Sequence, residues 1–319
     1  MSVYRYSVWF VKGLREYTKT GFIAAQKSFN PDALDADISQ RSFMITGANS
    51  GVGKATATVL AKRGAVVHMV CRDQGRGEQA RDEIVEISGN SKVELHILDM
   101  SQPSTVRKFA REFVSSERPL HVLVNNAGCM VNQRELTTDE LEKNFATNTL
   151  GTYILTNELI PCLSRNESPR VITVSSGGML LVKLDHTDLQ SQNMSKFDGA
   201  MVYAQNKRQQ VVMTERWADK YPNIYFASMH PGWADTPAVR TSMPDFYNRT
   251  KHVLRSAEQG ADTSIWLCIS PNVSQHPNGS FFQDRNPVPK HLPLAWTKSS
   301  LEEENELMLA LDAMSKKFQ

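Results

Sequence analysis

Tyr203 and Lys207 are the side chains in this sequence best suited to acid-base chemistry. The segment 203–207 reads YAQNK, so on a helix the phenol and the ammonium share one face, one turn apart. A tyrosine ordinarily has a pKa near 10, and a cation held close by favours the phenolate. We therefore expect Tyr203 to protonate a carbonyl oxygen or to deprotonate an alcohol, with Lys207 lowering its pKa.

Hydroxyl groups precede this pair at the end of an apolar run. Residues 171–176 read VITVSS, and open α/β sheets bind their ligands at the C-terminal ends of parallel strands. Ser176 can hydrogen-bond the reacting oxygen of a substrate, and Ser175 is the alternative, because neighbouring strand residues face opposite sides. Asn148 is expected inside a buried helix, where its amide can hold a water next to Lys207.

A glycine-rich turn lies at the end of the first apolar run. Residues 46–53 read TGANSGVG, directly before a helical pattern. Glycines at 47, 51 and 53 permit a tight turn and a close backbone approach, while the N-terminus of the following helix attracts an anion. The strand before the turn and the helix after it favour a dinucleotide-binding site over an ordinary structural turn.

Arg72 bears on which dinucleotide binds. An acidic residue at the end of the second strand would accept hydrogen bonds from a ribose 2′-hydroxyl, but this strand ends in Cys71 and Arg72. A guanidinium there suits a 2′-phosphate, so NADP(H) is preferred, and Lys54 offers a second positive charge. Asp73 beside Arg72 leaves use of NAD(H) open.

The remaining pattern predicts the elements that position these groups. Short apolar runs alternate with helical segments, which is typical of an α/β doubly wound parallel sheet, the Rossmann fold. We expect a catalytic domain over 41–285, an aromatic N-terminal extension over 1–40, and a C-terminal extension over 286–319 that contains a helix. The expected strands are 42–46, 66–71, 93–99, 121–125, 171–175 and 225–230, and the expected helices are 54–63, 77–86, 104–114 and 300–318.

Composition excludes several classes of function. Lys and Arg number 36 against 34 Asp and Glu, which gives no basic excess for nucleic-acid binding. The four cysteines are scattered and no histidines cluster along the sequence, so neither a metal site nor a disulfide framework is expected. The N-terminus lacks the pattern of a signal peptide, which favours an intracellular, cytoplasmic protein.

The first 40 residues mix aromatic and basic side chains, including Trp9 and Phe10 with Lys12 and Arg15. One interpretation is a helix packed against the domain's own surface. The other is an amphipathic helix in peripheral contact with a membrane, a lipid surface or a partner. The sequence alone does not decide between them.

Taken in order, these motifs resemble the classical short-chain dehydrogenases/reductases over residues 41 to about 285. The resemblance rests on TGANSGVG at 46–53, NNAG at 125–128, the serine at 176, YxxxK at 203–207 and PGWADT at 231–236. The segments 230–239 and 283–285, with the aromatic N-terminus, are similar to one subgroup of that family. A departure is the long stretch between Ser176 and Tyr203, which retinol-dehydrogenase-like members share and which favours a lipophilic substrate.

The resemblance implies a role for each matching residue. Tyr203 would be the acid/base, Lys207 would also bind the nicotinamide ribose, Ser176 would orient the substrate, and Asn148 would support a proton-relay water. The segment 240–255 corresponds to the family's substrate lid, although its apolar residues are equally suited to a core. The residues expected to contact the cofactor are Gly47, Asn49, Ser50, Gly51, Val52, Gly53, Arg72, Asp99, Asn125, Ala127, Gly128, Tyr203, Lys207, Pro231, Gly232 and Thr236.

Three functions follow from these observations, and an oxidoreductase acting on a small alcohol or carbonyl compound is the one we favour. The alternatives are an NADP-binding scaffold with little turnover and a protein that binds a lipid surface or a partner through residues 1–40. The substrate, the direction of the reaction and the oligomeric state, a homo-oligomer included, stay open at this stage.

Overall fold

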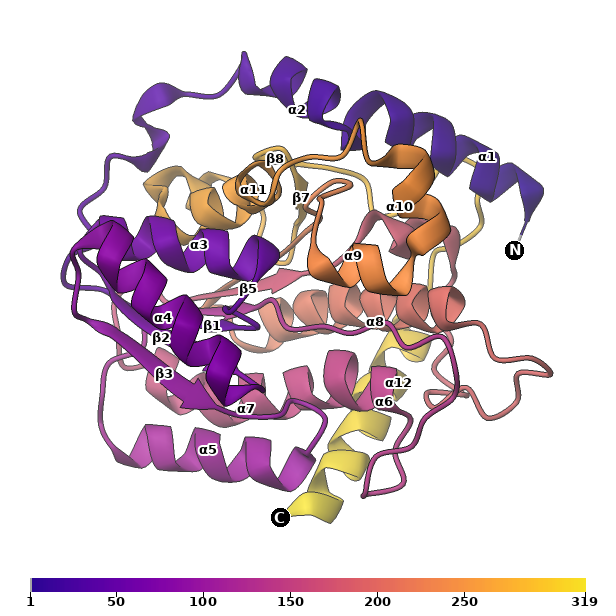
Figure 1. Ribbon diagram of the computed structural model, residues 1–319. Coiled ribbons are helices and arrows are strands. Elements are labelled where there is room, and N and C mark those ends of the chain that lie inside the picture. Colours follow the sequence, from indigo (N-terminus) through magenta and orange to yellow (C-terminus); the bar gives the residue numbers. More distant parts are fainter. Residues whose placement is uncertain (1) are drawn as a thin grey trace.

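The computed structural model describes residues 2–319 and builds them around one eight-stranded sheet (Figure 1). The strand order is β3-β2-β1-β4-β5-β6-β7-β8; β1 to β7 pair in parallel, and β8 pairs antiparallel with β7. The chain winds outward in both directions from β1 and β4, which is the doubly wound Rossmann arrangement. The strands are β1 (Ser42–Thr46), β2 (Val66–Cys71), β3 (Val93–Ile97), β4 (Val122–Asn125), β5 (Arg170–Val174), β6 (Tyr225–Met229), β7 (Phe281–Gln283) and β8 (Asn286–Pro287).

Helices cover both faces of the sheet, as a parallel sheet requires. One layer contains α3 (Gly51–Lys62), α4 (Gln74–Ser88) and α11 (Ala257–Ile269), and its core includes Ala57, Ile84 and Leu267. The other contains α5 (Pro103–Ser115), α7 (Gly151–Leu163), α8 (Gly199–Lys220) and the C-terminal α12 (Leu301–Ser315). Every residue of β1 is buried, because both layers contact it.

Shorter helices follow several strands and surround the edge where the strands end. After β4 come α6 (Lys143–Phe145) and a π-helical turn (Ala146–Leu150), and after β5 comes a 3-10 turn (Gly177–Leu181). After β6 come α9 (Pro237–Ser242) and α10 (Pro244–Thr250).

The N-terminal segment lies across the molecule above α9, α10 and α11, as the indigo helices of Figure 1 show. It consists of α1 (Val3–Lys12), a π-helical turn (Gly13–Tyr17) and α2 (Lys19–Gln26). A glycine is needed at position 13 because the Trp233 ring packs directly against the backbone there, and a Cβ would lie 2.2 Å from Cζ2 of Trp233. Trp9 and Phe10 also contact Trp233, so α1 packs against the domain on that side. Within residues 2–319, no helix has the length and apolarity needed to cross a bilayer.

Candidate active site

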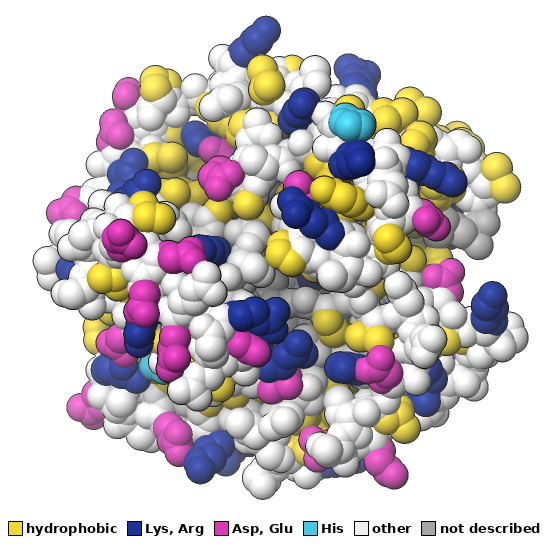
Figure 2. All heavy atoms as spheres, in the orientation of Figure 1, with side chains coloured by type: hydrophobic (Ala, Val, Ile, Leu, Met, Phe, Trp, Pro, Cys, Tyr) yellow, Lys and Arg dark blue, Asp and Glu magenta, His cyan; other side chains and the backbone are white. Residues whose placement is uncertain are grey.

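A cleft of about 740 Å³ lies where the parallel strands end. Residues that follow β1, β2, β3, β4, β5 and β6 all line it, which is where doubly wound sheets bind their ligands. Figure 2 shows a hollow near the centre of that face, with Lys and Arg side chains along its lower edge.

The glycine-rich turn between β1 and α3 has the geometry of an anion site. Gly47 and Gly51 have φ of +67° and +53°, a backbone conformation that favours glycine, and a Cβ at Gly53 would lie 2.5 Å from the carbonyl oxygen of Gly47. No side chain caps the N-terminus of α3, so its first amides are free to bind an anion. Residues 49–53 line the cleft, and the turn therefore fits a pyrophosphate.

The charges at the end of β2 differ in part from the expectation. Arg72 lines the cleft and is exposed, as expected for a residue that binds a phosphate. Arg76, on the first turn of α4, lines it as well and was not anticipated. Lys54 instead pairs with Glu83 on α4 and does not line the cleft, because it lies one position past the turn on the side of α3 that faces α4. The positive charges at this end of the cleft are therefore those of Arg72 and Arg76, and not those of Arg72 and Lys54 as expected.

The segment after β4 places small residues and an amide at the floor of the cleft. Asn126, Ala127 and Gly128 line it, and the Thr46 hydroxyl accepts hydrogen bonds from the amides of Asn126 (3.0 Å) and Ala127 (2.9 Å). Asn125 does not line the cleft: its amide donates to Thr156 Oγ1 (2.9 Å) in the core. As the last residue of β4, Asn125 takes the buried side of the strand, so its neighbour Asn126 reaches the cleft instead.

Asp99, two residues past β3, lines the cleft as expected. Its carboxylate accepts hydrogen bonds from the amide (2.9 Å) and the hydroxyl (2.8 Å) of Ser101, which fix its orientation.

Pro231, Gly232 and Thr236, after β6, line the cleft as well. Thr236 caps α9 by accepting from the amide of Val239 (3.3 Å). Gly232 has φ of +77°, and a Cβ there would lie 2.3 Å from Nε of the buried Arg255. Gly232 lies between the cleft and the Arg255 guanidinium, where there is no room for a side chain.

The two serines at the end of β5 have different surroundings. The Ser175 hydroxyl is buried and donates to the carbonyl oxygen of Lys207 (2.9 Å). The Ser176 side chain is partly exposed in the cleft, and its oxygen accepts from the amide of Gly178 (3.2 Å), which leaves its proton for a ligand. Ser176 therefore has the geometry of the substrate-orienting serine, and Ser175 ties β5 to α8.

Tyr203 and Lys207 lie one turn apart on α8 and both line the cleft. The Lys207 ammonium lies 5.4 Å from the centre of the Tyr203 ring and donates to the Val174 carbonyl (2.8 Å) and Gln210 Oε1 (2.9 Å). Burial lowers the pKa of Lys207 to about 7, and burial raises the pKa of Tyr203 above its ordinary value. The direction of the Tyr203 pKa shift is opposite to the one expected, because burial disfavours the phenolate and the Lys207 ammonium is directed at Val174 and Gln210.

Asn148, in the π-helical turn, is bonded mainly within the protein. Its side chain accepts from the amide of Cys129 (2.8 Å) and donates to the Cys129 carbonyl (2.8 Å) and Asn206 Oδ1 (3.1 Å). Both amide hydrogens are therefore in use, and the second lone pair of Oδ1 is the part of the side chain left for the water that we expected beside Lys207. Gln210 connects the two residues instead, since it accepts from Lys207 and donates to the Asn148 carbonyl oxygen (2.6 Å).

Aromatic residues line the rest of the cleft, and of these only Phe246 and Trp233 lie in segments that the sequence assigned to the site. Tyr6 and Trp9 reach it from α1, Trp233 from the segment after β6, and Phe246 from α10 within the expected lid. Trp233 connects the set, with ring centres 5.7 Å from Trp9 and 5.2 Å from Phe246. The spacing of Tyr6 and Trp9, three positions on one helix face, was the signal available in the sequence, but it does not name the surface that the face covers.

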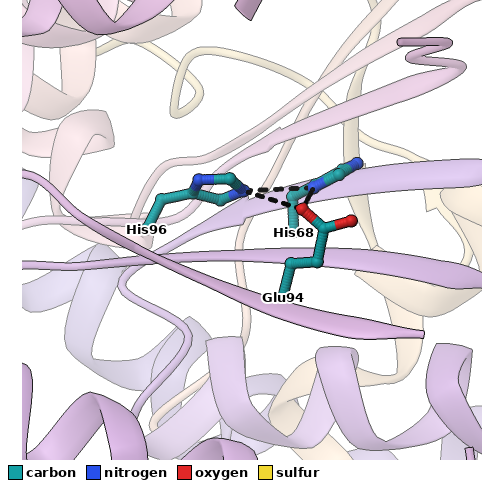
Figure 3. A group of neighbouring side chains, drawn as sticks. All are labelled: His68, Glu94 and His96. Carbon is teal, nitrogen blue, oxygen red and sulfur yellow. Dashed lines mark hydrogen bonds and ion pairs between the residues drawn. The ribbon is translucent and has the colours of Figure 1, made fainter. Parts of the chain in front are cut away.

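His68 on β2 and Glu94 and His96 on β3 form a cluster that lies apart from the cleft (Figure 3). His68 Nδ1 and His96 Nε2 lie 3.1 Å apart and hydrogen-bond each other, and Arg118 pairs with Glu94 at 2.5 Å. Neighbouring strands bring these groups together, so their separation along the chain hid the cluster. Since the guanidinium already neutralises the carboxylate, we assign the three residues to the packing beneath α5.

Comparison with known proteins agrees with this geometry. The pattern of the family described as short chain dehydrogenase matches residues 41–186. Dehydrogenase/reductase SDR family member 12 of Homo sapiens is 59% identical over 318 residues, which cover 100% of both chains. The chain belongs to the short-chain dehydrogenase/reductase family. It is accordingly an NAD(P)-dependent oxidoreductase, and the subgroup indicated by 230–239 and 283–285 is confirmed.

Two further relatives extend the comparison. Retinol dehydrogenase 11 of Mus musculus is 32% identical over 269 residues, covering 83% of this chain and 81% of the relative. A short chain dehydrogenase from Escherichia coli CFT073, solved in complex with NADPH, has a TM-score of 0.63 at 20% identity and covers 81% of this chain and 100% of that one. The solved structure supports the fold of this member of the family.

Proposed function

We propose that this short-chain dehydrogenase/reductase is an NADP(H)-dependent carbonyl reductase, or alcohol dehydrogenase in reverse, for a lipophilic substrate. The observation behind the proposal is that Ser176, Tyr203 and Lys207 meet at the floor of one cleft whose opposite end holds two arginines. The nicotinamide, when bound, supplies the hydride in reduction and accepts it in oxidation.

The chain's own residues provide the proton and the orientation. Ser176 donates a hydrogen bond to the carbonyl oxygen, and Tyr203 gives that oxygen its proton as the hydride reaches the carbon. Because burial raises the pKa of Tyr203, the phenol keeps its proton at neutral pH, which suits the reductive direction. Lys207 lies beside the tyrosine, where its ammonium can donate to a ribose hydroxyl.

The cofactor preference rests on Arg72 and Arg76. Both guanidinium groups line the cleft beyond the end of β2, where the adenosine ribose of a dinucleotide lies in this fold. Asp73 is the nearest acidic group, and it accepts from the amide of Arg76 (2.9 Å) as the N-cap of α4. Asp73 also lines the cleft, but two guanidinium groups beside one carboxylate leave a net positive charge there, which favours NADP(H) over NAD(H).

We propose in addition that the outer face of the N-terminal segment makes peripheral contact with a lipid surface. Val3, Val11, Leu14 and Ile23 are between 48% and 83% exposed. Basic residues lie among them, which is typical of interfacial helices. An intracellular location fits the four free cysteines, at 71, 129, 162 and 268.

A matched set of variants tests the chemistry. Tyr203→Phe keeps the ring and removes the proton, so it should reduce single-turnover rates about 10²–10⁴-fold while NADPH affinity stays within twofold. Lys207→Ala should reduce both quantities. Ser176→Ala should lower turnover more than Ser175→Ala, the matched control, because only the hydroxyl of Ser176 is available to a ligand. Normal single-turnover chemistry in Tyr203→Phe would refute the mechanism.

A further inference from the structure

The N-terminal helix α1 forms part of the cleft itself. Tyr6 and Trp9 line it, although they lie almost 200 positions before Tyr203 in the sequence. Trp9 packs against the buried cluster of Leu181, Val182 and Ala204, and Ala204 directly follows Tyr203 on α8. The N-terminal residues therefore border the catalytic end of the cleft.

Specific contacts hold α1 in this position. The Trp9 indole donates to the carbonyl oxygen of Gly177 (2.8 Å), the residue after Ser176. Tyr17 is fully buried, and its ring packs edge-on against His230, with the two ring centres 4.2 Å apart. The carbonyl oxygen of Tyr17 accepts a hydrogen bond from the amide of Trp233 (2.8 Å). These are directional bonds to the segments that follow β5 and β6, so the helix has a defined place against the site.

The chemistry of this end of the cleft is apolar. Its apolar lining consists of four aromatic rings, one thioether and one aliphatic side chain: Tyr6, Trp9, Trp233, Phe246, Met201 and Leu181. The lining arginines, Arg72 and Arg76, belong to the opposite end, and Lys207 is directed at Val174 and Gln210. Arg5 of α1 also reaches this end, but its guanidinium donates to the Leu181 carbonyl oxygen (3.5 Å) and does not line the cleft, so a substrate with a carboxylate or phosphate near its carbonyl would find little positive charge to neutralise it.

We propose that α1 is a substrate-binding wall that selects elongated apolar aldehydes, ketones or alcohols. The inference rests on the proposed function and gives its substrate a chemical class. Tyr6 and Trp9 contact the apolar tail of the substrate, while Trp9 is also a positioning residue that holds Gly177, and with it Ser176, through its indole N–H.

The experiment measures kcat and KM for NADPH-dependent reduction of straight-chain aldehydes from butanal to decanal. Tyr6→Ala removes a half-exposed ring and should lower kcat/KM for decanal about tenfold, while butanal turnover and NADPH affinity stay within twofold. Trp9→Phe keeps an aromatic wall and loses the bond to Gly177, so it should lower kcat equally at every chain length. Ser7→Ala, at an exposed position of α1 that does not line the cleft, is the matched control and should change neither quantity.

A second measurement separates this inference from the proposed function. Calorimetric titration of octanol into protein saturated with NADP reports tail binding without turnover, and Tyr6→Ala should weaken it about tenfold. If the unmodified protein reduces no aldehyde, the proposed function fails, but octanol binding still tests whether α1 binds an apolar tail. Equal losses at all chain lengths in Tyr6→Ala, or unchanged octanol binding, would overturn the inference.

Discussion

Arg255 joins the N-terminal segment to the catalytic domain, and replacing it by leucine tests how firmly. Its side chain is 1% exposed and donates to both carboxylate oxygens of Asp284, at 2.6 and 2.9 Å. It also donates to the carbonyl oxygens of Glu16 (2.6 Å) and Thr18 (3.3 Å), 239 and 237 positions away. Arg255→Leu removes these four bonds and a longer one to the Pro231 carbonyl oxygen (3.5 Å), and it leaves the Asp284 carboxylate buried.

The cost follows from that geometry. Removing one partner of a buried ion pair costs about 3–5 kcal/mol, mostly because the remaining charge loses its compensation. The carbonyl groups lose donors as well, but the effects overlap and we take about 4 kcal/mol as the total. Compared with a usual free energy of unfolding of about 5–15 kcal/mol, this is a large loss, and for a chain of this length it lowers Tm by about 6 °C.

Urea unfolding of three variants provides the measurement. Arg240→Leu breaks an Arg–Asp pair that is 56% exposed on the arginine side, and as the matched control it should cost at most about 1 kcal/mol. Arg255→Leu with Asp284→Asn removes the uncompensated charge, so it should recover part of the loss; asparagine tolerates the φ of +48° at this position. If Arg255→Leu costs no more than Arg240→Leu, the reasoning from burial is wrong.

Three further outcomes are expected. Unmodified protein should bind NADPH at least about tenfold more tightly than NADH, and Arg72→Asp should reverse that order in equilibrium titrations. Burial lowers the pKa of His68 from 6.5 to about 4, so between these pH values the histidine is protonated in the unfolded chain and neutral in the folded one. The free energy of unfolding should therefore fall as pH drops from about 6.5 to about 4, and the slope should be shallower in His68→Phe. Val11→Asp with Leu14→Asp should reduce flotation with anionic vesicles, and flotation of unmodified protein should weaken as salt rises.

The doubly wound sheet could be predicted from the sequence because its core strands are buried on both faces. Such strands are continuous apolar runs, and the expected bounds of β1 and β2 coincide with the observed ones. β7 and β8 were not anticipated, since strands of three and two residues carry too little pattern. β8 also extends the sheet beyond residue 285, where we expected the catalytic domain to end.

The direction of individual side chains could not be predicted in the same way. Motif and strand order indicate which segments meet at the cleft, but a shift of one residue reverses the face of a strand. Asn125 turns into the core while Asn126 reaches the cleft, and Lys54 pairs with Glu83 while Arg76 takes the place expected for it. In each case another residue with the same kind of side chain, an amide or a cation, lines the cleft in place of the expected one.

The N-terminal segment shows a different limit of sequence interpretation. Its aromatic face predicts that something apolar covers it, and a membrane and the domain's own surface satisfy that pattern equally well. The structure turns Trp9 and Phe10 toward Trp233, so these residues are not available to a bilayer, and only the opposite face of α1 remains for one. A segment with one face on the cleft and the other exposed can both bind substrate and contact a lipid surface. A lipophilic substrate that leaves such a surface would then meet α1 first.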